Sequence, residues 1–334
     1  MRAGSLAIKA YHLMLVLIES KSEKKAQNNT RLLMVSQKIS IAHISDLHRS
    51  LDNPVTNNAL WASLINDMDS YIEAGIKKPD ILVVSGDIVQ GAKNDDDFKA
   101  QYGEAVEFLA HLAENFFDGD RSRIILVPGN HDVNWSISKD SMEQVSEDRF
   151  LDENGLIKRE FQEYARPSGR NGYRWSWPER SFYRIKDLPA YNKRFLHFSE
   201  MYGEFYKGQR SYSHEPDEQF DIFDYPEFGL TFVGLNSCFC NDHLNRSGAI
   251  SPDGLANVGL QLRGYKKDGR FIFSVWHHNT RGGPHENNYM EPSFLKSLIS
   301  YGVKIGFHGH QHKQEILPRQ KNLWAVSGTG NAPS

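Results

Sequence analysis

The pattern of apolar and polar residues predicts strands alternating with helices from residue 39 onward. Apolar runs typical of buried strands occupy the first half of 39–48, then 81–85, 123–127, 228–235, 271–276, 303–307 and 323–327. Apolar residues at helical spacing predict helices over 57–76, about 96–115 and 292–301. Ser251-Pro252-Asp253 predicts another helix start, because Ser is a favoured N-cap and Pro suits the first helical position. This order indicates an α/β fold whose strands pair in parallel through right-handed crossovers.

Residues that can bind a metal ion follow five of these apolar runs. They are Asp46-Leu47-His48, Gly86-Asp87, Gly129-Asn130-His131, His277-His278 and Gly309-His310-Gln311-His312. An Asp and a His two positions apart on an extended segment point the same way. In parallel sheets, ligands bind beyond the carboxyl ends of the strands. Each motif is common by itself, but the ordered set of five predicts a single metal centre.

These motifs, in this order and each after an apolar strand, resemble those of the calcineurin-like metallophosphoesterase superfamily. The resemblance extends from about residue 39 to the end of the chain. It implies an α/β fold of four layers, an α-β-β-α sandwich of two mixed sheets with helices outside. It also implies a centre of two divalent metal ions that hydrolyses phosphoric esters.

The resemblance gives each motif residue an expected role. One ion would be bound by Asp46, His48 and His312, the other by Asn130, His277 and His310, with Asp87 bridging both. His277 is preferred to His278 because the family usually places its ligand directly after the strand. His131 is expected to be the catalytic histidine that binds no metal and protonates the leaving oxygen or stabilises the phosphoryl transition state.

The residue types independently fit this chemistry. Two cations about 3.5–4 Å apart clamp a phosphoryl group and acidify a bridging water, whose hydroxide attacks phosphorus opposite the leaving group. Carboxylate, amide and imidazole ligands without thiolate suit Mn, which we favour, while Fe, Zn, Ni and Mg stay open.

The second motif departs from that of the serine/threonine protein phosphatases, which carry Gly-Asp-x-x-Asp-Arg-Gly. Here Gln90 replaces the second Asp, and Gly91 follows where the phosphate-binding Arg would stand. The motif is more similar to the phosphodiesterase and nuclease branches. We therefore expect a phosphodiesterase acting on nucleic acid or nucleotides. A phosphomonoesterase is the alternative enzyme. A non-catalytic protein-binding scaffold is the alternative of another class, although a scaffold would be expected to lose ligands that are all present here.

The segment 134–225 interrupts the alternation of strands and helices, and it is long and rich in aromatic and basic residues. We interpret it as a loop-rich, cap-like insertion over the carboxyl ends of the strands. Such a cap could stack bases and bind backbone phosphates. The substrate-binding candidates are His278, Arg174, Trp175 and Tyr183. The alternative is a structural lid with a small core of its own.

Residues 1–38 are expected to be a loosely attached extension of a metallophosphoesterase domain spanning 39–334. The apolar stretch 6–18 suggests a helix and 19–31 a linker, with Met34 as an alternative natural start. A secretory signal is less favoured, because Lys9 and His12 interrupt the apolar stretch. At the other end, the chain stops soon after Gly328-Thr329-Gly330, which suggests a compact member or a missing C-terminal part.

Composition limits how a substrate can be attracted and where the protein is expected to be located. The 334 residues carry a net charge of −3, so an anionic substrate must be attracted by local features rather than by the whole surface. The chain has only two cysteines, Cys238 and Cys240, which favours a reducing, cytoplasmic location. No segment is long and apolar enough to cross a membrane. A protein partner or a homo-oligomer stays open.

The remaining histidines, the cysteines and Asp132 have other expected places. We expect His43 to be packed in the core and His308 to support a ligand. The surface set is His12, His111, His197 and His214, and His243 and His285 are expected in loops near the site. Cys238 and Cys240 have no expected role. Asp132 either holds its loop or tunes His131.

Overall fold

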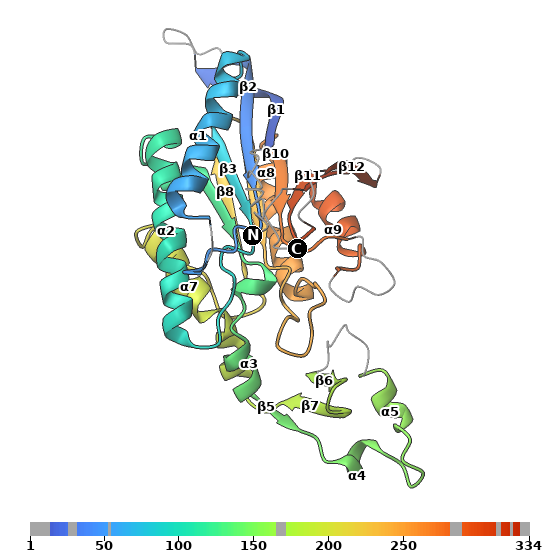
Figure 1. Cartoon of the computed structure of the whole chain (residues 1–334). Helices are drawn as coiled ribbons and strands as arrows, with labels where there is room; N and C mark the ends of the chain where they lie inside the picture. Colours follow the sequence, from blue (N-terminus) through green and yellow to red (C-terminus); the bar gives the residue numbers. More distant parts are fainter. Residues whose placement is uncertain are drawn as a thin grey trace.

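The computed structural model describes residues 14–25, 32–52, 55–164, 172–280, 289–311, 315–320 and 323–327. Within these residues the chain forms two mixed sheets with helices packed outside them, as the sequence predicted (Figure 1). A four-stranded sheet has the order β1-β2-β3-β4, with bounds Met14–Lys25, Leu32–Ile44, Ile81–Ser85 and Ile124–Val127. A six-stranded sheet has the order β12-β13-β11-β10-β9-β8, with bounds Glu315–Gln320, Leu323–Ser327, Val303–His308, Phe271–Val275, Leu230–Leu235 and Phe220–Tyr225.

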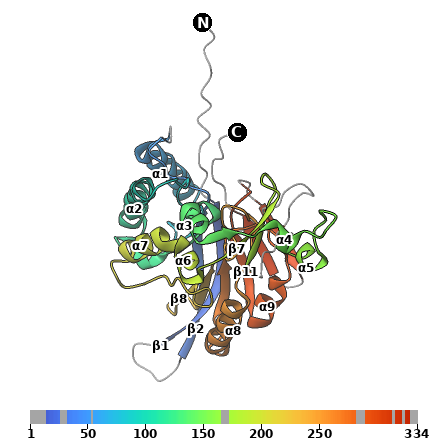
Figure 2. The same ribbon diagram turned by 90° about the horizontal axis from the view of Figure 1, so that it is seen from below.

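Helices flank the two sheets on opposite sides, as Figures 1 and 2 show. Beside the four-stranded sheet lie α1 (Asn57–Glu73), α2 (Asp95–Phe117) and α7 (Leu196–Phe205). Beside the six-stranded sheet lie α8 (Pro252–Lys267) and α9 (Phe294–Tyr301). The remaining short helices are α3 (Trp135–Asp140), α4 (Glu147–Phe150), α5 (Arg159–Gln162), α6 (Leu188–Asn192) and the 3-10 helices η1 (Arg121–Arg123), η2 (Asn130–Asp132) and η3 (Lys193–Phe195).

Local sequence explains where the long helices begin. The Asn94 side chain caps α2 by accepting a hydrogen bond from the Asp97 amide at 2.9 Å. At α8 the predicted cap is confirmed, because the Ser251 hydroxyl accepts from the Gly254 amide at 3.2 Å. Among the described residues no helix combines the length and the hydropathy needed to cross a membrane.

The main core lies where the two sheets face each other. Ile41 and Val83 from the four-stranded sheet share one apolar cluster with Phe232, Phe273 and Phe307 from the six-stranded sheet. The Phe232 and Phe273 rings stack with their centres 4.5 Å apart. A second cluster fills the space under α8 and α9. This packing fixes the carboxyl ends of β2, β3, β4, β10 and β11 relative to one another.

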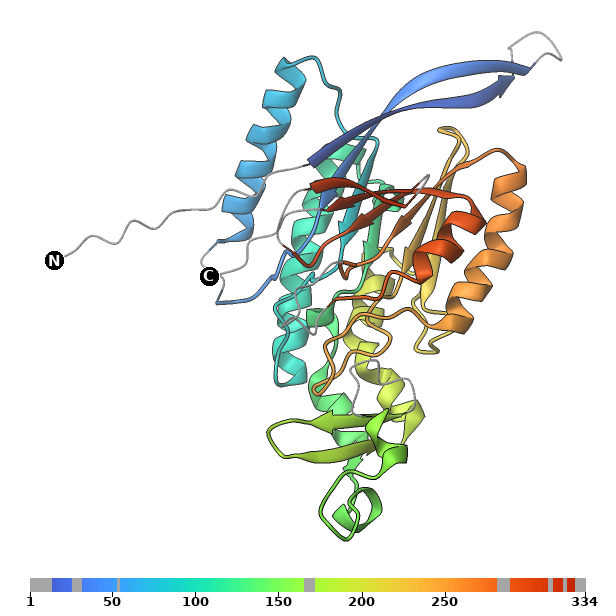
Figure 3. The same cartoon turned by 90° about the vertical axis from the view of Figure 1, so that its right-hand side faces the viewer.

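The N-terminal extension differs from expectation where it is described. Met14–Lys25 is a strand paired antiparallel to Leu32–Ile44, so the helix expected over 6–18 and the linker over 19–31 are wrong there. The pair forms a long ribbon that projects beyond the sheet (Figure 3). A short apolar run is compatible with either structure. Here the outer edge of β2 offers unpaired backbone groups, and pairing with β1 satisfies them. Residues 1–13 and 26–31 lie outside the described residues.

The insertion is more structured than the sequence suggested. It holds a three-stranded sheet in the order β5-β7-β6, with bounds Met142–Gln144, Ser181–Ile185 and Tyr173–Ser176. Val145, Phe150, Phe161 and Phe182 form its own small core. This sheet stands apart from the two main sheets, at one end of the molecule (Figures 1 and 3). The last part of the predicted insertion belongs to the main body, because α7 joins the main core and β8 is an edge strand of the six-stranded sheet.

Candidate metal centre

The five polar motifs lie together at the carboxyl ends of β2, β3, β4, β10 and β11. Main-chain hydrogen bonds tie the loops to one another. The Asp46 amide donates to the Gly86 carbonyl at 3.1 Å, the His48 amide to the Asp87 carbonyl at 2.9 Å, and the Gly309 amide to the His277 carbonyl at 3.0 Å. These bonds fix the relative positions of segments that are far apart in the sequence.

The backbone is strained at the same place. Asp46, His48, Asp87 and His310 have φ values of 56°, 44°, 51° and 75°. Side chains other than glycine rarely adopt this left-handed region, and strained residues of this kind cluster at functional sites. The strain turns each side chain out of its strand direction toward a shared space.

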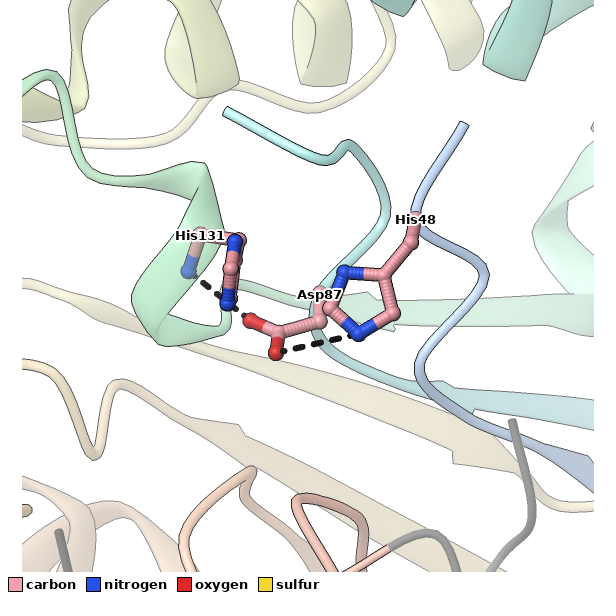
Figure 4. A group of neighbouring side chains, drawn as sticks. All are labelled: His48, Asp87 and His131. Carbon is pink, nitrogen blue, oxygen red and sulfur yellow. Dashed lines mark hydrogen bonds and ion pairs between the residues drawn. The ribbon is translucent and has the colours of Figure 1, made fainter. Parts of the chain in front are cut away.

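Asp87 stands at the centre of the arrangement. One of its carboxylate oxygens lies 3.8 Å from His48 Nε2, and the other accepts a hydrogen bond from the His131 amide at 2.9 Å (Figure 4). His48, Asp87 and His131 each offer a ligand atom within 4.8 Å of the others. Asp87, His277 and His310 form a second group of the same kind. A carboxylate shared by two groups is placed as a bridging ligand would be.

The second group contains an arrangement that calls for a cation. His277 Nδ1 lies 2.8 Å from the Ser85 carbonyl, which only accepts, so Nδ1 carries a proton and Nε2 is the nitrogen that faces the centre. That Nε2 faces an Asp87 carboxylate oxygen at 3.2 Å and the Asn130 Oδ1 at 3.0 Å. His310 Nδ1 lies 3.2 Å from the same atom. The Asp87 carboxylate and the Asn130 oxygen both accept hydrogen bonds, so the groups around Nε2 repel one another unless a proton on Nε2 or a metal ion lies between them. The donor set therefore fits a divalent metal ion.

Two glycines allow this close approach. A Cβ on Gly129 would lie 2.1 Å from an Asp87 carboxylate oxygen. A Cβ on Gly86, whose φ is +88°, would lie 2.8 Å from His277 Nδ1. Both positions exclude any larger residue.

Charge reinforces the pairing of Asp87 with His277. Burial alone would raise the pKa of Asp87, but His277 and His131 outweigh it and hold the pKa well below its usual range. Burial alone would lower the pKa of His277, but the Asp87 carboxylate raises it to about 9. The site thus favours positive charge at the point where the acceptors meet.

Asp46 is fully buried and reaches the centre through His310. The His310 amide donates to both Asp46 carboxylate oxygens, at 3.1 and 3.2 Å, and the Ser45 hydroxyl bonds to the same carboxylate. Of the expected ligands, Asp46, His48, Asp87, Asn130, His277 and His310 are therefore brought together. His312 lies outside the described residues.

His131 is oriented by a neutral partner. Its Nδ1 lies 2.6 Å from the Gln90 carbonyl oxygen, so this nitrogen carries a proton and donates it. The acceptor for this ring is thus the main chain of Gln90, the residue that replaces the second Asp of the protein phosphatase motif. The His131 ring also contacts the His48 ring edge to face, with ring centres 4.7 Å apart.

Asp132 has the loop-holding role that was one of two expectations. Its carboxylate accepts hydrogen bonds from the Gly129 and Ile88 amides at 2.7 and 3.2 Å and from the Tyr102 hydroxyl at 3.0 Å. It therefore ties the loop after β3 to the loop after β4. Burial and the charge of Asp87 raise its pKa to about 6, although these hydrogen bonds oppose the rise.

Ser237 is a supporting residue that the sequence did not reveal. Its hydroxyl accepts from the His277 and His278 amides, both at 3.1 Å, and lies 3.0 Å from His278 Nδ1. It follows β9 in Asn236-Ser237-Cys238, which is the only signal the chain offers. His278 itself is buried beside the centre, with its ring 4.9 Å from that of His310.

Two substrate-binding candidates in the insertion have structural places instead. Arg174 is 4% exposed and donates to Asp242 at 2.6 Å and to the Tyr191 hydroxyl at 3.1 Å. Trp175 packs against the small core of the insertion, 4.7 Å from the Phe182 ring. Aromatic and basic composition does not distinguish a buried lid core from a binding surface. Tyr183 is half-buried and bonds to Glu179.

The other expectations have mixed outcomes. His43 is in the core, as expected, and burial lowers its pKa to about 3. His111 is exposed, as expected. His197 is buried against the Phe98 ring, so the prediction that His197 lies on the surface was wrong. His214 is half-buried, and so is His243, which bonds to Ser138. His308 stacks on Trp276. Cys238 and Cys240 are buried free thiols. His12 and His285 lie outside the described residues.

Solved structures similar to this chain share little sequence with it. A dimetal phosphatase from Danio rerio is 11% identical with a TM-score of 0.42, and the alignment covers 87% of each chain. Phosphopantetheinyl hydrolase from Mycobacterium tuberculosis is 13% identical with a TM-score of 0.37, covering 86% of this chain and 89% of that one. A 5'-nucleotidase from Staphylococcus aureus, described as putative, is 13% identical with a TM-score of 0.37, covering 87% of this chain and 48% of that one. No curated protein sequence matches the chain.

The family model of the calcineurin-like phosphoesterases matches residues 39–314. This range holds all five motifs whose side chains converge around Asp87, and it is most of the chain. The members are metal-dependent hydrolases of phosphoric esters. The chain therefore belongs to the calcineurin-like phosphoesterase family.

Proposed function

We propose that the protein is a two-metal phosphodiesterase acting on nucleic acid or nucleotides. The observation that carries this proposal is the convergence of acceptors on His277 Nε2, which lies 3.2 Å from Asp87 and 3.0 Å from Asn130. When bound, two divalent cations would clamp the phosphoryl oxygens and activate a water molecule. One ion would be held by Asp46, His48 and His312, the other by Asn130, His277 and His310, with Asp87 shared.

The side chains of the centre differ in exposure, and this difference indicates where a substrate enters. Asp46, Asp87 and His277 are buried and form the floor. Asn130, His131 and His310 are half-buried and form the open edge. A phosphate ester that approached from this edge would meet His131 first. With Nδ1 fixed on the Gln90 carbonyl, His131 presents Nε2, which in the protonated ring can protonate the leaving oxygen.

The preference for diesters rests on charge. A monoester carries about one more negative charge than a diester near neutral pH, and enzymes that bind such dianions use guanidinium groups for bidentate contacts. The second motif offers no arginine here, since Gln90 and Gly91 occupy that part of the loop. A monoanionic diester needs less positive charge at the open edge.

The test compares bis(p-nitrophenyl) phosphate with p-nitrophenyl phosphate, using purified protein loaded with Mn²⁺. We expect metal-dependent hydrolysis of the diester with a kcat/KM at least about tenfold higher than that of the monoester. His310→Ala should abolish both activities, because it removes one of the converging groups. His111→Ala on α2 is the matched control, since that histidine is exposed on a helix, and it should leave the rates unchanged. Preference for the monoester would contradict the diesterase proposal, and full activity in His310→Ala would contradict the site.

We also propose Mn²⁺ as the working metal and a cytoplasmic location. The imidazole and oxygen donors suit Mn²⁺, and the free buried thiols Cys238 and Cys240 suit a reducing compartment. Metal analysis of protein purified without added metal checks the first part. More Zn or Fe than Mn in that protein would contradict it.

A further inference from the structure

An aromatic residue and an arginine contact each other across two loops that border the metal centre. Trp135 begins α3, four residues after His131. Arg246 lies in the loop between β9 and α8. The guanidinium carbon of Arg246 lies 5.2 Å from the centre of the Trp135 ring, within the range of a cation–π contact.

Both residues belong to segments that pack around His278. Trp135 packs in a small cluster with Cys238, whose sulfur lies 3.9 Å from His278 Nδ1. On the other side, a Cβ on Gly248 would lie 2.5 Å from the Cγ atom of His278, so the main chain just after Arg246 presses on this ring. The His278 ring is 4.9 Å from that of His310 in the centre. The loops that carry the pair therefore border the metal centre beside His278.

The loop that carries Arg246 is held firmly. The Asp242 carboxylate accepts hydrogen bonds from the Leu244 and Asn245 amides, both at 2.9 Å. The Asn245 side chain donates to the Cys240 carbonyl at 2.9 Å. The position of this loop is therefore fixed before any substrate binds, which reduces the conformational entropy lost on binding.

Arg246 differs from the arginines of the insertion in its surroundings. Arg174 and Arg194 are buried, and their N–H groups are used by internal partners. Arg246 is exposed, and no carboxylate among the described residues forms an ion pair with it. Trp135 beside it is half-buried. A cation without a counter-charge, seated on an indole at the border of a phosphoesterase centre, is suited to bind an anion with a flat ring attached.

We propose that Trp135 and Arg246 form the nucleoside subsite of this enzyme, an inference that rests on the proposed function. A base attached to the scissile diester stacks on the indole and on the guanidinium. Bases commonly stack on aromatic rings and guanidinium planes, with about 1–3 kcal/mol per base. The ligand is thus a phosphodiester that carries a nucleobase.

The test uses two substrates with the same leaving group and the same scissile bond. Thymidine 5'-(p-nitrophenyl phosphate) carries a base, and methyl p-nitrophenyl phosphate carries none. The variants are Trp135→Ala, Trp135→Phe and Arg246→Gln, with Arg263→Ala on the exposed face of α8 as the matched control. Circular dichroism and metal content verify that each variant is folded and loaded.

We expect Trp135→Ala and Arg246→Gln to raise KM for the thymidine ester about tenfold, with kcat changed less than twofold. KM for the methyl ester should change less than threefold. Trp135→Phe should retain most of the thymidine preference, because it keeps an aromatic face. Arg263→Ala should match the wild type.

Equal losses on both substrates, or no loss on either, would overturn the subsite. Trp177, in the insertion, is an exposed tryptophan. If Trp177→Ala raised KM for the thymidine ester while Trp135→Ala behaved like the wild type, the base would bind at Trp177, and the proposed subsite would also be overturned. Failure of the proposed function looks different, since the wild-type protein would then hydrolyse neither diester.

Discussion

Two polar clusters in this protein differ in how completely their hydrogen-bond donors and acceptors pair with one another. The anchor cluster, Arg174, Tyr191, Arg194 and Asp242, joins the insertion to the main body. The acceptor cluster, Asp87, Asn130, His277 and His310, lies at the strand ends. In the anchor cluster donors and acceptors match, since Asp242 accepts from Arg174 at 2.6 Å and from Tyr191 at 2.8 Å. Arg194 donates to three backbone carbonyls.

In the acceptor cluster the groups match only when a cation, either a proton on His277 or a metal ion, lies between His277, Asp87 and Asn130. A buried polar group is costly unless it has a partner. A cluster that is complete by itself therefore holds structure, and a cluster that lacks a cation is prepared to bind one. Both clusters are polar, although Asn130 and His310 are half-buried and the anchor cluster is fully buried, and the match of donors to acceptors distinguishes their roles.

The largest effect should come from Asp87→Asn. This change keeps the shape and removes the shared charge, so we expect kcat/KM on bis(p-nitrophenyl) phosphate to fall on the order of 10³-fold or more. The free energy of unfolding of metal-free protein should fall by only about 1–3 kcal/mol, because His277 and the His131 amide lose a charged acceptor but keep a neutral one, and His277 can release its proton. Steady-state kinetics and urea unfolding measure the two quantities. Asp217→Asn, an exposed carboxylate, is the control, and a large stability loss without loss of activity would reverse the comparison.

Asp242→Ala should have the opposite profile. It leaves the Arg174 guanidinium buried without its counter-ion, which costs about 3–5 kcal/mol in unfolding free energy. Glu143→Ala breaks the exposed pair with Arg184 in the same insertion and should cost less than about 1 kcal/mol. Urea unfolding followed by fluorescence compares the two variants. Similar losses in both would show that the anchor cluster has no special role.

Removing metal should destabilise the protein through the metal centre and not through the anchor cluster. With Mn²⁺ at about 100 times its Kd, binding adds roughly 2.7 kcal/mol to the free energy of unfolding. The melting temperature should therefore fall after treatment with a chelator and recover when Mn²⁺ is added. In Asp242→Ala the fall should keep its size, whereas in His310→Ala it should shrink. A chelator that leaves the melting temperature of the wild-type protein unchanged would contradict the cation site.

The smallest effect concerns His43, a buried polar residue in neither cluster. Burial lowers its pKa from 6.5 to about 3, so the unfolded chain binds a proton in this window and the folded chain does not. Its contribution to stability is therefore present above about pH 6.5 and is lost as pH falls toward 3. Between pH 7.5 and 5 the loss should be about 2 kcal/mol. Urea unfolding at both pH values should show a smaller pH difference in His43→Gln, and an equal difference would exclude His43 as the cause.

Regular periodicity made much of the fold predictable. The strands ending at Ser85, Val127 and Leu235 and the helix beginning after Ser251 follow from apolar runs and capping residues. The ribbon of β1 with β2 did not follow, because an apolar run suits either structure and only the open edge of β2 decides. The small sheet of the insertion was missed because its strands have only three to five residues, too few for a clear periodic pattern.

By itself, the sequence determined which chemical groups follow the strands and in what order, and this order indicates the family. Tertiary structure alone decided which buried polar groups meet an unmatched partner. Arg174 and His277 are both buried, yet Arg174 pairs with the Asp242 carboxylate, whereas His277 Nε2 meets the Asp87 carboxylate and the Asn130 amide oxygen together. This difference depends on contacts between segments that are far apart in the sequence. Arg174 and Asp242 are separated by 68 residues, and His277 and Asn130 by 147. Local residue patterns do not encode such contacts, because they arise only when the two sheets pack and the loops bond across their ends.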